Sequence, residues 1–172
     1  SYEKDGLLPR DTYGDWCVPP EDPKLIHSQD PARQTDGTLL GTAYFYEMLR
    51  LMERYAGMLG KPDDQRFFAE KAAVMRTAFQ KKWFNPETGL YGNGTQTASL
   101  LPLAFGIPPE EQRAALFTHL IGRIEKESNW HVGTGLIGAQ WLMRTLSDNG
   151  RPDVAFRIAT QKDYPGWGYM VS

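Results

Sequence analysis

The sequence predicts an all-α fold in which three helical hairpins follow one another and form about half of an (α/α)6 toroid. Three turns carry this prediction, each with glycine followed by proline and an acid: Gly60-Lys61-Pro62-Asp63, Gly106-Ile107-Pro108-Pro109-Glu110 and Gly150-Arg151-Pro152-Asp153. Glycine ends a helix because it enters the left-handed region without steric cost, and proline starts a helix because its fixed φ fits there. The three glycines are 46 and 44 residues apart, which is the length of one hairpin and its return loop.

The chain begins with a stretch that shows no helical period. Glycine and proline interrupt every candidate helix here, so we expect residues 1–37 to be an irregular lead-in loop of the same domain. Within it, the segment Tyr13-Gly14-Asp15-Trp16 places two aromatic rings and one carboxylate on a glycine turn. Long loops inside compact domains are often functional, which makes this turn a candidate site.

The first hairpin is predicted to pair a helix over 39–59 with a helix over 62–83. Thr38 is a suitable N-cap for the first helix, whose half from Leu39 to Leu49 is apolar nearly all round. That pattern indicates burial on both sides. The second helix has an apolar stripe and a charged face, as expected for a helix that borders water.

The same contrast repeats in the rest of the predicted domain, residues 38–172. Helices expected over 95–105 and 134–147 are almost wholly apolar, and their partners over 110–127 and 152–161 are amphipathic. A closed two-layer ring produces this alternation, because outer helices wrap inner ones. The usual ring has six hairpins, so three of them leave an open side. We expect apolar side chains on that side, namely Leu100, Leu101, Leu103, Leu136, Ile137, Trp141 and Leu142.

The composition excludes several classes of function. Nineteen basic and 21 acidic residues give a net charge of −2 without a basic stripe, which argues against nucleic acid and against an anionic membrane as partners. Cys17 is the only cysteine, so no internal disulfide can form. The three histidines lie far apart in the sequence, and we expect neither a metal site nor a cofactor.

Six segments distributed along the chain carry a resemblance to a known family. They are Tyr13-Gly14-Asp15-Trp16, Gly41-Thr42-Ala43-Tyr44, Gly94-Thr95-Gln96-Thr97-Ala98, His131-Val132-Gly133-Thr134-Gly135-Leu136-Ile137-Gly138, Gly150-Arg151-Pro152-Asp153-Val154-Ala155 and Tyr164-Pro165-Gly166-Trp167-Gly168-Tyr169-Met170-Val171. Together, and in this order, they resemble segments of bacterial α-L-rhamnosidases over essentially the whole chain.

The resemblance implies a six-hairpin glycoside hydrolase that releases terminal α-L-rhamnose from glycosides or polysaccharides. In that family a carboxylic acid protonates the leaving oxygen and a second carboxylate activates water, with inversion at the anomeric carbon. The matching stretches would lie upstream of residue 1 and beyond residue 172, so no residue here is assigned as catalytic acid or base. We therefore expect a piece of a longer bacterial protein that is inactive alone, from the cytoplasm, the periplasm or outside the cell.

Two kinds of partner follow from the resemblance and from the open ring. One is a rhamnose-containing carbohydrate, and the other is the remainder of the chain's own barrel or a second copy. The candidate sugar-binding residues are Asp15, Trp16, Gln96, His131 and Trp167. Each has a structural alternative. Asp15 and Trp16 can form an Asx turn beside a core tryptophan, and Gln96 can cap its own helix. His131 can be a hydrogen-bonding loop residue, and Trp167 can pack in the core.

The aromatic return loops also bear on an alternative function. A stack of helical hairpins can be a binding or scaffolding module that recognises a peptide or a protein on its concave face. Solenoid repeats usually keep short polar turns, whereas the return loops of this chain contain glycine and tryptophan. The glycosidase reading is therefore favoured over the scaffold.

Overall fold

The protein is a bundle of six helices joined as three hairpins, described by a computed structural model over residues 2–11 and 13–171. Residues 1, 12 and 172, which the expected domain bounds include, lie outside the described residues. The helices are α1 (Gly37–Met58), α2 (Pro62–Trp83), α3 (Gln96–Phe105), α4 (Glu110–Gly122), α5 (Leu136–Asp148) and α6 (Pro152–Ala159). The predicted all-α class and its three hairpins are confirmed.

The three turns that predicted the hairpins have the expected backbone. Gly60, Gly106 and Gly150 have φ values of 65°, 67° and 79°, in the left-handed region that favours glycine. Pro62 and Pro152 occupy the first turns of α2 and α6, where a missing N–H leaves no hydrogen bond unmade. In each hairpin the first helix thus ends and the second begins within a few residues.

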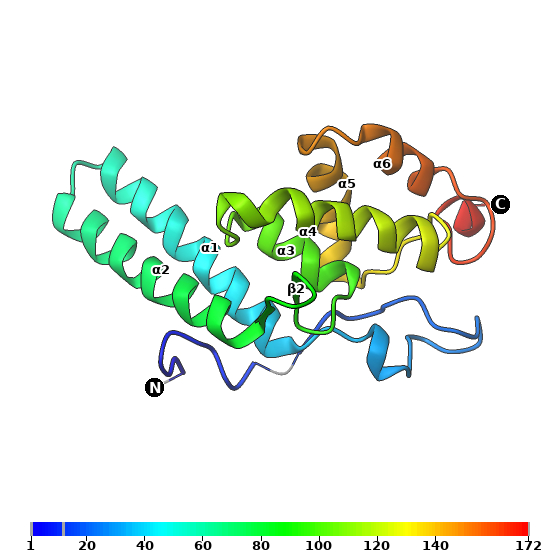
Figure 1. Ribbon diagram of the computed structural model, residues 1–172, viewed down its shortest axis with the longest axis horizontal. Helices are drawn as coiled ribbons and strands as arrows, with labels where there is room; N and C mark the ends of the chain where they lie inside the picture. Colours follow the sequence, from blue (N-terminus) through cyan, green and yellow to red (C-terminus); the bar gives the residue numbers. More distant parts are fainter. Residues whose placement is uncertain (1, 12, 172) are drawn as a thin grey trace.

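The hairpins are arranged in two layers (Figure 1). Helix α1 packs on α2, α3 on α4 and α5 on α6, while α3 also packs on both α1 and α5. Inner helices α1, α3 and α5 therefore follow one another, and each is covered by its outer partner. In Figure 1 the lead-in, drawn in blue, runs along one edge of the molecule.

The inner helices are buried to different extents, and this corrects part of the prediction that seven apolar side chains lie on an open side. Helix α3 is buried on all sides over Gln96–Pro102, because α1 and α5 flank it and α4 covers it. Leu100, Leu101 and Leu142 are fully buried and do not lie on an open side, so their predicted exposure is wrong. Leu136 is 62% exposed, as expected of an open face. The remaining three, Leu103, Ile137 and Trp141, are half-buried.

Helix α1 carries a further stripe of exposed apolar side chains. Met48, Met52 and Tyr55 are 48%, 40% and 51% exposed, and their spacing of four and three residues places them on one stripe. Met48 thus interrupts the burial predicted for the first half of this helix. Helix α1 packs mainly on α2 and α3, and the three side chains of this stripe stay partly exposed.

Three local features differ from the sequence expectation. Asp36, and not Thr38, caps α1, and its carboxylate accepts from the Thr38 amide at 2.9 Å and from the Trp83 indole at 3.1 Å. The amphipathic run after Glu110 ends as an α-helix at Gly122 and continues as a π-helical turn, η2 (Arg123–Glu127). The first return loop contains a small antiparallel pair, β1 (Phe84–Asn85) with β2 (Leu90–Tyr91).

The lead-in is attached to the rim where the inner helices begin. The Thr35 and Thr95 hydroxyls lie 2.6 Å apart, and the Asn93 amide donates to the Gln34 carbonyl at 2.8 Å. It contains one 3-10 turn, η1 (Pro31–Arg33), and a second 3-10 turn, η3 (Gly168–Val171), lies near the other end of the chain. The lead-in therefore brings its side chains to the edge at which the return loops meet.

Candidate functional site

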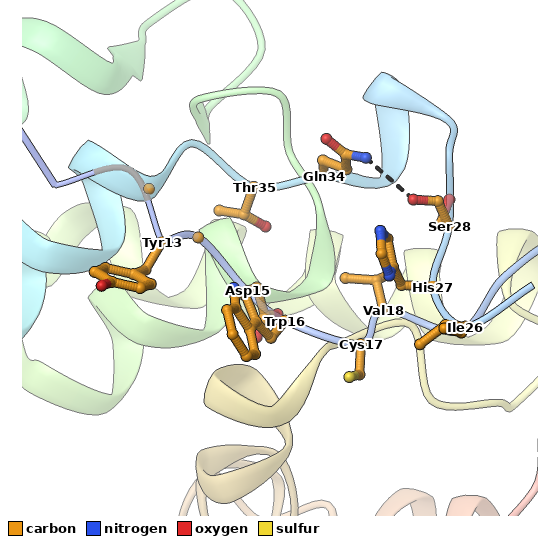
Figure 2. Close-up of a pocket in the computed structure, with 12 residues that line it drawn as sticks. Tyr13, Asp15, Trp16, Cys17, Val18, Ile26, His27, Ser28, Gln34 and Thr35 are labelled. Carbon is orange, nitrogen blue, oxygen red and sulfur yellow. Dashed lines mark hydrogen bonds between the residues drawn. The ribbon is translucent and has the colours of Figure 1, made fainter.

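A cleft of about 560 Å³ opens in the lead-in at this rim (Figure 2). Its walls are the stretches 13–18, 26–28 and 34–35, together with Gly37. Clefts of this volume suit a small ligand, with apolar walls for area and a few polar groups for orientation. The cleft contains two of the five predicted sugar-binding residues, Asp15 and Trp16.

Two aromatic rings stand at one wall of the cleft. Tyr13 is 77% and Trp16 59% exposed, and their ring centroids lie 6.3 Å apart at an interplanar angle of 49°. In Figure 2 both rings project from the same short loop. Exposed rings with polar edges combine a flat apolar face with a hydrogen-bonding group, which suits the apolar face of a sugar ring.

The opposite wall is held in place by Glu21. The Ser28 hydroxyl and the Arg33 guanidinium both donate to its carboxylate, the latter at 3.3 Å. The Ser28 hydrogen bond, helped by backbone amides and by Arg33, lowers the pKa of Glu21 from 4.5 to about 2. Ser28 is itself buried, and its amide donates to the Val18 carbonyl at 2.9 Å. This ties the two walls together.

Asp15 lies behind the aromatic wall and is bonded to two inner helices. Its carboxylate accepts from the Thr97 hydroxyl on α3 and from the amides of Gly135, Ile137 and Gly138 at 2.7, 2.9 and 3.1 Å. All of these donors are protein groups. The side chain therefore connects the lead-in to the beginnings of α3 and α5.

Gln96 is 2% exposed and also bonds to protein groups. Its Nε2 donates to the Ser128 hydroxyl at 2.9 Å and to the His131 carbonyl at 3.3 Å, while its Oε1 accepts from the Gly133 amide at 3.0 Å. The amide thus holds the return loop between α4 and α5 against the start of α3. Gln96 is not among the residues that line the cleft.

His131 lies in that return loop and is 6% exposed. Its Nδ1 is 3.1 Å from the Ser128 carbonyl, which makes Nδ1 the donor. Its Nε2 is 3.6 Å from the Asp163 carboxylate and has no hydrogen-bond partner among the described residues. Trp167 is half-buried against the apolar cluster of α3 to α6. Neither residue is among those that line the cleft.

Within residues 2–11 and 13–171, no group of three histidine, cysteine, aspartate or glutamate side chains is placed to hold a metal ion. The same described part of the chain contains no helix with the length and apolar content needed to cross a membrane.

Comparison with known proteins identifies the family to which this architecture belongs. Residues 1–172 match the family described as the bacterial alpha-L-rhamnosidase 6 hairpin glycosidase domain. The chain belongs to this family. As a rhamnosidase-type domain, it supplies three hairpins, which is half of the six that the family description states.

Relatives and solved structures agree with this assignment. The α-L-rhamnosidase of Streptomyces avermitilis is 35% identical over 97% of this chain, and that of an Alteromonas species is 30% identical over 100%. The structure of the Streptomyces avermitilis enzyme complexed with L-rhamnose covers 99% of the chain with a TM-score of 0.84 and 32% identity. That of the Aspergillus terreus enzyme also covers 99%, with a TM-score of 0.86 and 29% identity.

The chain matches only a small part of the length of these relatives. The chain spans 15% of the Streptomyces avermitilis protein and 18% of the Alteromonas protein. Most of each relative therefore lies outside the matched region.

Sequence reasoning did not name several residues of the cleft. Tyr13 lines the cleft although it is not among the predicted sugar contacts, and its position three residues before Trp16 is the sequence signal that indicates it. Ser28, Gln34 and Thr35 line the opposite wall and carry no local pattern. They reach the cleft only because the lead-in folds back on the rim.

Proposed function

We propose that this domain is part of an inverting glycoside hydrolase that releases terminal α-L-rhamnose. The observation that supports it most is the match of the whole chain to a rhamnosidase family, including a relative solved with L-rhamnose at 32% identity. The described residues supply a cleft with an aromatic wall at the rim where the inner helices begin. A rhamnose-containing carbohydrate fits that chemistry.

The five predicted residues have different parts in this proposal. Trp16 contacts the sugar with its exposed ring, while Asp15 and Gln96 shape the rim through their bonds to the return loops. His131 offers a buried Nε2 without a partner among the described residues, and Trp167 packs against the apolar cluster of α3 to α6. Of the five, Asp15 and Trp16 line the cleft itself.

The general acid and the general base are proposed to lie outside this chain. Inversion requires a protonated carboxyl group at the leaving oxygen and a carboxylate that activates water on the opposite face. No residue of this chain has a position that matches either carboxylate of the family. Losing either member of an acid–base pair typically lowers the rate by roughly 10²–10⁴. The chain alone is therefore inactive.

The exposed face of α1 is proposed to pack against a partner, either the remainder of the chain's own barrel or a second copy. Met48 and Leu51 border a second cleft of about 530 Å³ between α1 and α5, with Trp141 on its far side. Burial raises the pKa of Glu47, which also lines it. Sedimentation of the purified chain tests this, since a stable monomer that binds no hydrophobic dye would contradict it.

The activity is tested with an aryl α-L-rhamnoside. The full-length protein that carries this chain should hydrolyse it, and NMR should detect the inverted anomer of L-rhamnose as the first product. The 172-residue chain should not turn it over. Turnover near that of the full-length protein, in a chain preparation shown by mass spectrometry to contain no other fragment, would refute the assignment of the carboxylates. A full-length protein that cleaves other glycosides but not rhamnosides would refute the substrate.

A further inference from the structure

Helix α5 has no capping side chain of its own. Its N-cap is Gly135, which cannot cap, and four consecutive backbone amides at this end point at residues about 120 positions earlier. Asp15 accepts three of them, from Gly135, Ile137 and Gly138, and the Trp16 carbonyl accepts the fourth, from Leu136, at 2.6 Å. The pair Asp15-Trp16 therefore replaces the usual cap by satisfying all the amides that a helix start leaves open.

The carboxylate of Asp15 has little capacity left for a ligand. Its Oδ1 accepts two hydrogen bonds and its Oδ2 accepts two more, one of them from Thr97 on α3. A carboxylate has about four acceptor sites in total. A sugar hydroxyl would have to displace one of these partners, and the displaced amide would lose its hydrogen bond at a helix start.

Trp16 shows the reverse arrangement. Its backbone carbonyl is bonded to α5, while its side chain is 59% exposed at the cleft. Glycine allows this close approach, because a Cβ on Gly135 would lie 2.1 Å from the Trp16 carbonyl oxygen and 2.6 Å from that of Asp15. The backbone of the pair is thus clamped to the helix, and the indole is the part that remains available.

We propose that Asp15 is a positioning residue, which caps α5 and thereby fixes the Trp16 indole at the cleft, and that of these two side chains only the indole contacts the sugar. This inference rests on the proposed function, because it concerns the same cleft. Because Asp15 and Trp16 are adjacent, the sequence suggests that both contact the sugar. The structure instead gives Asp15 a positioning role and leaves sugar contact to Trp16. The consequence is that Asp15 affects sugar binding only through Trp16.

A double-mutant cycle in the full-length protein tests this dependence, with L-rhamnose as the probe. Asp15→Asn should weaken L-rhamnose binding by roughly tenfold, a mid-range effect for coupled neighbours. In the Trp16→Ala background the same change should have no further effect, within about twofold. If the two changes multiply, Asp15 contacts the sugar independently and the proposal is wrong. Asp30→Asn is the matched control, because Asp30 caps η1 in the same lead-in and does not line the cleft.

A second variant leaves the carboxylate intact. Gly135→Ala should displace the Trp16 carbonyl, and it should therefore weaken L-rhamnose binding although Asp15 is unchanged. Gly122→Ala is its control, because a Cβ there would meet no atom within 4 Å. Wild-type affinity in Gly135→Ala would overturn the proposal even if Asp15→Asn does not fold.

A spectroscopic measurement needs no sugar. In protein labelled with 5-fluorotryptophan, the ¹⁹F resonance of Trp16 is identified by its loss in Trp16→Phe. Asp15→Asn and Gly135→Ala should shift or broaden that resonance, whereas Asp30→Asn and Gly122→Ala should not. An unchanged Trp16 resonance in both test variants overturns the inference. Failure of the wild-type protein to bind L-rhamnose instead refutes the proposed function, and the ¹⁹F result still decides the role of Asp15.

Discussion

Replacing Gln96 with alanine should lower the stability of the domain. The side chain makes three hydrogen bonds, to the Ser128 hydroxyl at 2.9 Å, the His131 carbonyl at 3.3 Å and the Gly133 amide at 3.0 Å. All three partners lie in the return loop before α5. Gln96 itself is the first residue of α3, where alanine is well tolerated by the helix. The effect therefore measures the loop contacts and not the helix propensity.

The magnitude follows from the groups that lose their partner. Gly133 N–H and His131 C=O would remain without this partner in a mostly buried loop, at about 1–3 kcal/mol each. The same loop holds Asn129 and Trp130 at φ values of 45° and 64°, a strained conformation that persists only where its surroundings fix it. Relaxation of that strain offsets part of the loss. We expect a net destabilisation of about 2–4 kcal/mol, against a typical total of roughly 5–15 kcal/mol.

Urea unfolding followed by circular dichroism measures this change. With a slope of roughly 2 kcal/mol per molar, the midpoint of Gln96→Ala should fall by about 1–2 M. Gln140→Ala is the matched control: Gln140 is exposed on α5, and among the described residues its side chain accepts from the Tyr44 hydroxyl alone, at 3.1 Å. It should change stability by less than about 0.5 kcal/mol. Gln96→Ala with a wild-type midpoint but weaker L-rhamnose binding would refute the structural role and favour direct contact with the sugar.

Two further predictions concern pH and packing. The pKa of Glu21 is lowered to about 2 in the folded state, so its stabilising effect is present above 4.5 and is lost as the pH falls from 4.5 towards 2. Glu21→Gln should therefore destabilise the domain at pH 7 but have a smaller effect at pH 3; equal losses in urea midpoints at both pH values would contradict the role given to Ser28 and Arg33. Phe79 is fully buried against Trp83 and Tyr91, so Phe79→Ala should cost about 3–5 kcal/mol. The same change at Phe67, which is 52% exposed, should cost far less, and similar midpoints for the two variants would show that the packing argument fails.

The helices were predictable because their signals are local. Gly60, Gly106 and Gly150 each adopt the positive φ that their place before proline suggested, and five of the six helices end or begin within three residues of the expected limits at both ends. The exception, α4, gives way to a π-helical turn after Gly122. Backbone propensity acts over a few residues, so a single sequence contains what is needed.

Burial around the ring was less predictable because it depends on which helices are neighbours. Leu100 and Leu136 are both apolar residues of inner helices, yet one is fully buried and the other is 62% exposed. Periodicity describes the faces of one helix and not the order in which helices surround it. That α3 lies between α1 and α5 is a property of the assembled hairpins.

The candidate site shows the same limit more sharply. The sequence predicts Asp15 as a site residue, but the partners of its carboxylate lie at the beginnings of helices some 80 to 120 residues later. No spacing rule connects such positions, and the nearest sequence signal is Gly135, where the absence of a side chain admits the lead-in backbone. The residue types indicate that this loop is functional. The separate roles of the carboxylate and the indole become visible only in the folded structure, where the loop packs against the helices.

The polar side chains of Asp15 and Gln96 are hydrogen-bonded within the protein, and this limits how they can bind a sugar. Both carboxylate oxygens of Asp15 accept from protein donors, and the Gln96 amide donates through Nε2 and accepts through Oε1, so these hydrogen bonds stabilise the rim. The exposed Tyr13 and Trp16 rings are left to interact with a ligand mainly through their faces. Ring faces discriminate poorly among sugars, because directional hydrogen bonds are what reject a wrong hydroxyl. We therefore infer that Tyr13 and Trp16 contribute mainly apolar affinity, and that selectivity for rhamnose depends on polar groups other than Asp15 and Gln96.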